Sequence, residues 1–217
     1  MALVQSGAPE PAGARDMPQA GFFTAFGLFA AREFFDAALC ARLRSEMRSA
    51  TGGPGRVWVG DRYVEDPNLR RTTVVEVSPG VSSLVEARLL ALKPSLEEHF
   101  QTALGACQPL QFLRYRTGDY YRRHPDRDAT PGAARTPKDR KVSVVVFLNR
   151  QSPQPEDGCY CGGALVFYGL AANPALKHHG IPLAGEEGAL IAFRPEIVHE
   201  VTPVEEGERF TIGTWFL

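Results

Sequence analysis

The stretch KVSVVVFLN, residues 141–149, decides the fold class of this chain. It is almost continuously apolar and β-branched, which is typical of a strand in the core of a sheet. Four similar runs lie between residue 108 and the end of the chain, separated by glycine, proline and charged residues: PLQFLRYR, GALVFYG, GALIAFRP and RFTIGTWFL. The last of these alternates in part and favours a strand with one buried face. Together the five runs predict an antiparallel double sheet.

The part of the chain before residue 108 has a different pattern of apolar residues. Residues 26–50 carry apolar side chains near every fourth position, with charged residues between them, and predict an amphipathic helix that TGGPG ends. Residues 82–104 predict a second helix, which we expect Pro94 to split or kink. Between the two helices, RVWVGDRYVED and RRTTVVEVSPG predict short strands.

The length of 217 residues favours a single domain. We expect residues 1–20, rich in alanine, glycine and proline, to be disordered, and residues 21–217 to form one domain. Within this domain, we expect residues 21–107 to form supporting helices and residues 108–217 to form the core. The fold class expected from this order is α+β.

The charge and cysteine content limit the partners and the compartment. A net charge of −1 gives no general attraction to nucleic acid or to an anionic membrane, and no stretch approaches the length of a transmembrane helix. The first residues lack the basic and apolar regions of a secretory signal. Four cysteines fit a reducing compartment, so we expect a cytoplasmic protein. DGCYCGG has no second cysteine or histidine pair at zinc-finger spacing, which favours two free thiols.

Three residues have the composition of a metal site. His124 and Asp126 lie in YYRRHPDRD, residues 120–128, and His199 follows the apolar run ALIAF. Two histidines and one carboxylate form the facial triad that holds iron(II) and leaves coordination positions open. The alternative for His124 and Asp126 is an ordinary polar turn, and for His199 a core histidine.

Arg209 stands at the start of the last apolar run, after the turn EEGE. An inward guanidinium on such a strand needs an anionic partner, and its planar fork suits a carboxylate. A surface ion pair with Glu205 or Glu206 is the alternative. The sequence therefore offers three metal ligands and a carboxylate clamp.

The order and spacing of these residues resemble the iron(II)- and 2-oxoglutarate-dependent dioxygenases, specifically their prolyl-4-hydroxylase-like branch. The resemblance covers roughly residues 108–217. A lone H-x-D is a weak signal, whereas four elements in the right order are a strong one. The elements are Y-x-x-G-x-x-Y-x-x-H-x-D from Tyr115 to Asp126, R-x-x-S-x-x-x-F-L-N from Arg140 to Asn149, G-G-x-L-x-F from Gly162 to Phe167, and H-x-V-x-P-V-x-x-G-x-R from His199 to Arg209, with Trp215 following on the last strand.

The resemblance implies a double-stranded β-helix, or jelly roll, with N-terminal supporting helices. It implies that His124, Asp126 and His199 ligate iron(II). Arg209 would bind the distal carboxylate of 2-oxoglutarate, and Tyr115 would donate a hydrogen bond to the same cosubstrate. Oxygen is the second cosubstrate, and ascorbate is a further expected cofactor.

Two positions depart from the family pattern. Phe147 stands where a strand tyrosine often bonds the cosubstrate, and Gly213 stands where the last strand sometimes carries a threonine. We expect Thr211 or Ser143 to supply a hydroxyl instead. The departures concern secondary contacts of the cosubstrate and leave the carboxylate clamp in place. Trp215 is expected to be a core residue.

The function implied is hydroxylation of an unactivated C–H bond, with release of succinate and carbon dioxide. The closest reaction is that of a prolyl 4-hydroxylase, on a prolyl residue of a protein or peptide or on a small amino-acid-like molecule. The alternatives are a non-catalytic sensor that binds 2-oxoglutarate or metal, and a cupin-type metalloenzyme, which would not need Arg209. The intact triad argues against the sensor.

Basic residues crowd the segment 122–141 around the H-x-D motif. A solvated loop is the ordinary explanation, and a lid with affinity for an acidic substrate or protein surface is the functional one. No aromatic side chains interleave with these charges, so a nucleic-acid partner is not expected. The oligomeric state stays open.

Overall fold

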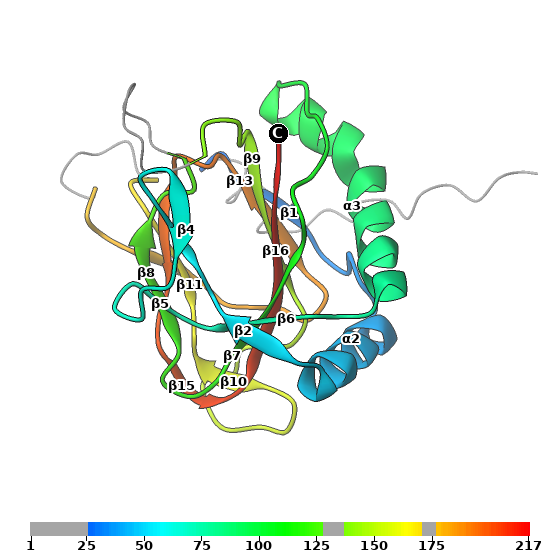
Figure 1. Ribbon diagram of the computed structural model, residues 1–217, viewed down its shortest axis with the longest axis vertical. Coiled ribbons are helices and arrows are strands. Elements are labelled where there is room, and N and C mark those ends of the chain that lie inside the picture. Colours follow the sequence, from blue (N-terminus) through cyan, green and yellow to red (C-terminus); the bar gives the residue numbers. More distant parts are fainter. Residues whose placement is uncertain (1–25, 128–136, 171–176) are drawn as a thin grey trace, which may run out of the picture.

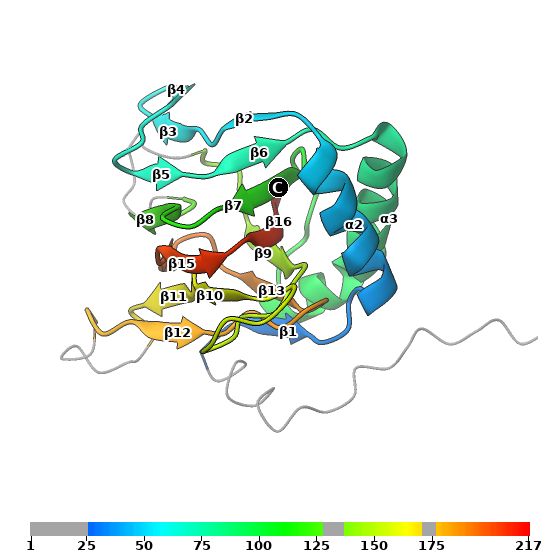
Figure 2. The same ribbon diagram turned by 90° about the horizontal axis from the view of Figure 1, so that it is seen from below.

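The computed structural model describes residues 26–127, 137–170 and 177–217. The segment 1–20, for which disorder was expected, lies outside the described residues, as does most of the basic loop. Two layers of strands face each other, and two helices cover the outer side of one layer (Figures 1 and 2). Among the described residues, neither helix combines the length and apolar character needed to cross a bilayer.

The larger sheet has seven strands, and its pairings are antiparallel. In order across the sheet they are β1 (Phe29–Ala31), β13 (Leu190–Phe193), β9 (Val142–Phe147), β16 (Arg209–Phe216), β7 (Gln111–Tyr115), β6 (Thr73–Val75) and β2 (Gly52–Pro54). The run KVSVVVFLN thus supplies a central strand, as its continuous apolar character predicted.

The smaller sheet has five strands and faces the first. In order they are β12 (Ile181–Leu183), β11 (Leu165–Tyr168), β14 (Val198–Val201), β8 (Tyr120–His124) and β5 (Arg70–Arg71). Two further pairs complete the described strands: β10 (Tyr160–Gly162) with β15 (Val204–Gly207), and the hairpin of β3 (Val57–Val59) and β4 (Arg62–Val64). The antiparallel double sheet is confirmed, and its arrangement is that of a jelly roll.

Successive side chains of β16 point alternately to the outer and the inner face of the larger sheet. Phe210, Ile212 and Phe216 point to the helices and join a core cluster there. Arg209, Thr211, Gly213 and Trp215 point between the sheets, where they line a cavity. The prediction of a single buried face for this strand is wrong, because the helices cover the outer face and the second sheet covers the inner one.

The helices α2 (Ala37–Ser49) and α3 (Pro79–Phe100) pack on the outer face of the larger sheet (Figure 2). Asp36 caps α2 by accepting a hydrogen bond from the Leu39 backbone N–H at 2.7 Å. The helix buries Cys40, Leu43 and Met47 on one face, at the spacing an amphipathic helix requires. This packing supports the larger sheet from outside, and the inner face of the same sheet forms one side of the cavity.

Three sequence predictions need correction here. The predicted helix 26–50 forms only from Ala37, because Phe29–Ala31 pairs as β1 with the edge of β13. The expected split of the second helix at Pro94 does not occur, because Leu89 before the proline and Leu96 and Phe100 after it are all buried in the same core, and the helix runs on to Phe100.

The third correction concerns the segment 21–107, which is more than helical support. Its strands β1, β2, β5 and β6 extend both sheets of the core. That residues 21–217 form a single domain stays a proposal.

Candidate active site

Strand pairing brings the three candidate ligands together. His124 ends β8 and stands directly opposite His199 on β14, with the two ring centroids 4.4 Å apart. Asp126 follows two residues after His124, and its backbone N–H donates to the carbonyl of Pro195 at 2.8 Å. One ligand atom from each side chain lies within 4.8 Å of the other two, which is compatible with a single shared metal ion.

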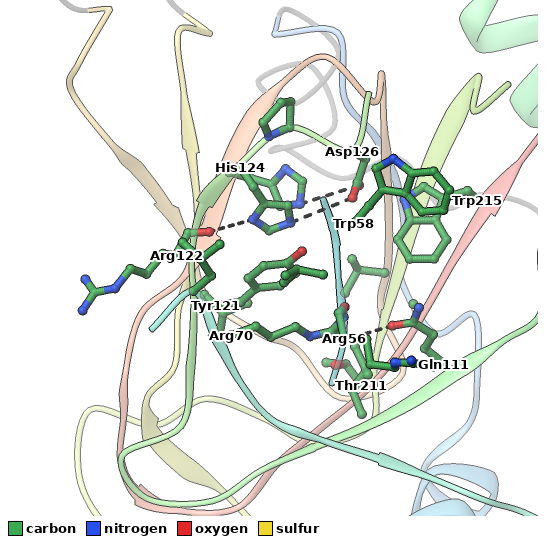
Figure 3. A pocket seen from close by; sticks show the side chains of 18 of the residues that line it. Arg56, Trp58, Arg70, Gln111, Tyr121, Arg122, His124, Asp126, Thr211 and Trp215 are labelled. Atoms are coloured by element: carbon green, nitrogen blue, oxygen red, sulfur yellow. Dashed lines mark hydrogen bonds and ion pairs between the residues drawn. The ribbon is translucent and has the colours of Figure 1, made fainter. Parts of the chain in front are cut away.

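The histidine rings are oriented for metal binding. Nδ1 of His124 lies 2.7 Å from the carbonyl oxygen of Arg122, and Nδ1 of His199 lies 2.9 Å from that of Ile197. Each Nδ1–H therefore donates to backbone, and each Nε2 presents its lone pair to Asp126, at 3.9 and 3.7 Å (Figure 3). Burial and the neighbouring His199 lower the pKa of His124 to about 3, so its imidazole is neutral, as a ligand must be.

Asp126 is 6% exposed and is held by two neighbours, Ser143 on β9 and Arg140 just before that strand. Ser143 donates its hydroxyl to Oδ2 at 2.7 Å, and Nη1 of Arg140 lies 3.7 Å from Oδ1. Burial by itself raises the pKa of Asp126, but the two histidines, Arg140 and Ser143 together bring the pKa below its ordinary value. The carboxylate is therefore ionised and fixed in direction.

Arg209 is the most unusual side chain of the site, because it is a cation that is 1% exposed. Its Nη1 donates to the hydroxyl of Thr211 at 3.2 Å, while Nε and Nη2 have no hydrogen-bond partner among the described residues. Its Cζ lies 5.0 Å from the ring centroid of Tyr115 and 5.9 Å from that of Tyr160. The alternative of a surface ion pair is wrong, since Glu205 and Glu206 are exposed on β15.

These residues fit the two groups that the sequence resemblance implies. Two imidazoles and one ionised carboxylate are a donor set for iron(II). The free N–H groups of Arg209 match the bidentate geometry of a carboxylate, and they are buried, so a ligand would satisfy them. Gly163 leaves room for the Arg209 side chain itself: a Cβ there would lie 3.1 Å from Cδ of Arg209, and its φ of +57° disfavours other residues.

The triad and Arg209 share one cavity of about 340 Å³ between the sheets, within the usual range for small-molecule sites. Trp215 lines it, with the guanidinium of Arg140 3.5 Å from its ring centroid, so the expectation that Trp215 is a core residue and not a site residue is wrong. Of the two hydroxyls expected to replace the missing ones, Thr211 reaches Arg209, whereas Ser143 is used by Asp126.

Sequence reasoning missed several residues of the site. Tyr160 is buried near Arg209, and its hydroxyl has no hydrogen-bond partner among the described residues. Arg70 and Trp58 line the cavity itself. Tyr160 stands just before the Gly-Gly element and could have been noticed there. Nothing in the local pattern distinguished Arg70 from the other arginines.

A jelly roll that holds two imidazoles and a carboxylate beside a buried arginine belongs to the class of non-haem iron oxygenases. The comparisons with known proteins specify the family. Residues 110–217 match the model of the 2OG-Fe(II) oxygenase superfamily. A PKHD-type hydroxylase of Synechococcus elongatus is 28% identical over 195 residues, which cover 83% of this chain and 74% of that protein.

Solved structures agree in fold. A prolyl-4-hydroxylase of Pseudomonas putida superposes with a TM-score of 0.67 at 23% identity, covering 91% of this chain and 95% of that one. A prolyl hydroxylase of Trichoplax adhaerens, in complex with a hypoxia inducible factor peptide fragment, superposes with a TM-score of 0.66 at 18% identity. The superposition covers 91% of this chain and 86% of that one. The chain belongs to the 2OG-Fe(II) oxygenase superfamily and is a 2-oxoglutarate-dependent dioxygenase of prolyl-4-hydroxylase-like type. Its cofactor is iron(II), and its cosubstrates are 2-oxoglutarate and oxygen.

Proposed function

We propose that this dioxygenase hydroxylates a prolyl residue of a protein or peptide, or a small amino-acid-like molecule, and releases succinate and carbon dioxide. The observation that carries the proposal is the placement of His124, Asp126 and His199 in one cavity with the buried Arg209, whose Nε and Nη2 have no hydrogen-bond partner among the described residues. The similarity to prolyl hydroxylases from Pseudomonas putida and Trichoplax adhaerens supports the choice of reaction.

In this proposal the residues divide into two groups. His124, Asp126 and His199 hold iron(II) through Nε2, a carboxylate oxygen and Nε2. Arg209 receives the distal carboxylate of 2-oxoglutarate, with the hydroxyl of Thr211 beside its Nη1. The side chain of Tyr115, which is 1% exposed, stands over the same guanidinium and would donate to the cosubstrate.

The bound iron and cosubstrate supply oxidative decarboxylation and the oxidising power for a C–H bond. The chain supplies position and exclusion of water. Ser143 and Arg140 hold the Asp126 carboxylate in one orientation, so that the ligand set is organised in advance. Leu113, Leu165 and Val201 are buried walls of the cavity and keep it apolar between the polar groups.

Another part of the cavity lining suits a small saturated ring. Trp215 presents its indole to the cavity, and Arg140 stacks against that indole and fixes its plane. A flat aromatic face is a good surface for the C–H groups of a pyrrolidine ring. This supports a prolyl or proline-like substrate over a long flexible chain.

The test is release of succinate from 2-oxoglutarate by the purified protein with iron(II) and air, with and without ascorbate. We expect slow release without substrate, its loss in His199→Ala, and a strongly raised 2-oxoglutarate requirement in Arg209→Lys, because a lysine loses the bidentate fork. His179→Ala is the matched control, since His179 is exposed and outside the cavity.

Two results would count against the proposal. Succinate release that persists in His199→Ala would show that the triad does not carry the reaction. Failure of the wild type both to release succinate and to bind 2-oxoglutarate in the presence of metal would refute the assignment of the cavity itself.

A further inference from the structure

A second buried arginine lines the cavity, and the proposed reaction does not use it. Arg70 lies on β5 of the smaller sheet and is 6% exposed. Its side chain reaches under Tyr121 toward Gln111 (Figure 3). Arg209, by contrast, belongs to β16 of the larger sheet, so the two guanidinium groups enter the cavity from different layers.

The polar contacts of Arg70 are all neutral. Nη1 donates to the backbone oxygen of Arg56 at 3.0 Å, and Nη2 donates to Oε1 of Gln111 at 3.0 Å. Nε is buried without a hydrogen-bond partner, close to Gly55. An arginine has five N–H donors, so three of them are unused in the part of the chain that the structure describes. Within the same part, no carboxylate lies at ion-pair distance from Arg70.

A buried cation without a counter-charge is unfavourable, and the surroundings of Arg70 add to the positive charge. Four other arginines line the cavity besides Arg209: Arg56, Arg122, Arg123 and Arg140. Asp126 is the one carboxylate among the described lining residues, and the candidate metal site uses it. Arg123 finds its partner outside the lining, in Glu200 at 3.8 Å. The excess of cations favours an anionic occupant.

Arg70 is also close to the reacting centre. Arg70 pairs with Tyr121 across β5 and β8, and its Cζ lies 4.7 Å from the centroid of the Tyr121 ring. The same ring stacks on His124, with centroids 3.6 Å apart and planes 18° from parallel. Figure 3 shows Tyr121 between the imidazole above and the guanidinium below. A group bound at Arg70 would therefore sit about one aromatic ring away from a candidate iron ligand.

We propose that Arg70 binds a carboxylate of the primary substrate and so selects acidic substrates. The inference rests on the proposed function, since it assigns the substrate class of the same cavity. The carboxylate has two sources that share one chemistry: an acidic residue next to the hydroxylated position of a peptide, or the α-carboxylate of a free amino acid. Gln111, which already orients Arg70, is the positioning residue for this contact.

The competing explanation is that Arg70 only ties the β3–β4 hairpin to β7 through its two neutral hydrogen bonds. That role would make Arg70 important for folding but indifferent to the charge of the substrate. The two explanations are separated by comparing acids with their amides, which have nearly the same shape.

The experiment uses the full chain saturated with manganese(II) and 2-oxoglutarate, so that no turnover occurs. Trp58 and Trp215 are the two tryptophans of the sequence and both line the cavity, so their fluorescence reports its occupancy. Two probe pairs are titrated: acetyl-prolyl-glutamate amide against its glutamine analogue, and L-proline against L-prolinamide. The first pair represents the peptide source, and the second represents the amino-acid source.

We expect one acid to bind at least about tenfold more tightly than its amide, the factor that a charge-assisted hydrogen bond supplies. In Arg70→Gln the ratio of the two affinities should fall to about one. In Arg70→Lys part of it should remain, because the charge is kept. Arg71→Gln is the matched control: Arg71 is the next residue, is exposed and pairs weakly with Asp119, so the ratio should not change.

Equal affinity of acid and amide in both pairs, or no binding by any probe, overturns the proposal. An acid preference that survives in Arg70→Gln also overturns it. If Arg70→Gln does not fold, Arg70→Lys decides: an acid-to-amide ratio as high as that of the wild type overturns the proposal, and a reduced ratio supports it. Succinate release and 2-oxoglutarate binding by the wild type are measured in parallel. The absence of both refutes the proposed reaction, whereas equal affinity of the wild type for acid and amide, with succinate release intact, refutes the role of Arg70 alone.

Discussion

Replacing Arg209 by methionine should make the ligand-free protein more stable while it removes cosubstrate binding. Arg209 is 1% exposed, and two of its three nitrogen atoms have no acceptor among the described residues. An unsatisfied buried donor costs about 1–3 kcal/mol, and the hydrogen bond to Thr211 that would be lost contributes about 1 kcal/mol. Methionine has a similar length and no charge. The net expectation is a gain of roughly 1–2 kcal/mol in the free energy of unfolding.

Thermal unfolding with and without 2-oxoglutarate measures both effects. At this size, 1 kcal/mol shifts Tm by roughly 2–4 °C, so Arg209→Met should melt a few degrees above the wild type without ligand. With manganese(II) and 2-oxoglutarate at about 100 times Kd, the wild type should gain about 2.7 kcal/mol. The variant should gain only what the metal alone provides.

Arg114→Met is the matched control for this experiment. Arg114 lies on the neighbouring strand β7, and its Nε donates to Glu208 at 2.7 Å. Because Arg114 has a carboxylate partner, its loss should lower Tm and leave the 2-oxoglutarate effect intact. If Arg209→Met melts below the wild type without ligand and is still stabilised by 2-oxoglutarate, then Arg209 is a structural residue and the reasoning about its unpaired nitrogens fails.

Three further outcomes are expected. Ser143→Ala should weaken metal binding about 10–100-fold in calorimetric titration, because Asp126 loses the hydroxyl that orients it; an unchanged affinity would exclude this role. Asn149→Ala should lower the free energy of unfolding by about 2–4 kcal/mol in urea titration, since it strands a buried backbone N–H and two carbonyls, and a loss under about 1 kcal/mol would contradict this. Burial raises the pKa of Cys40 to about 11, so at pH 8 a thiol reagent should modify Cys159 first and Cys40 only on unfolding, as peptide mapping would show.

The core strands that sequence reasoning found after residue 108 are those whose side chains are mostly apolar. KVSVVVFLN and RFTIGTWFL became β9 and β16 because their residues are buried by two layers. The strands β8 and β14 escaped detection because their residues, YYRRH and VHEV, include the candidate ligands and charged residues of the cavity mouth. The segment around Phe29 was mistaken for helix because its spacing of apolar residues suits either element, and only the edge of β13 decides between them.

The candidate site could be predicted where motif order carried the information. His124, Asp126, His199 and Arg209 lie together as expected, although their roles as ligands stay a prediction. Arg70 could not be predicted in the same way. Arg70 is a candidate because it is buried and has no counter-charge among the described residues. Both properties depend on the pairing of β5 with β8. The order of arginines in the sequence indicates neither which of them is buried nor which lacks a counter-charge.

The distribution of the site between the two layers has a consequence for binding. His124 and His199 belong to the smaller sheet, whereas Arg209 and Thr211 belong to the larger one. Asp126 follows the smaller sheet but is held by Ser143 of the larger. A cosubstrate that reaches from the metal to Arg209 would therefore join the layers at the cavity, in addition to the core contacts that already hold them. Local opening of the smaller sheet should then slow on binding, which makes hydrogen exchange of β8 and β14 a more sensitive reporter of occupancy than exchange of the central strand β9.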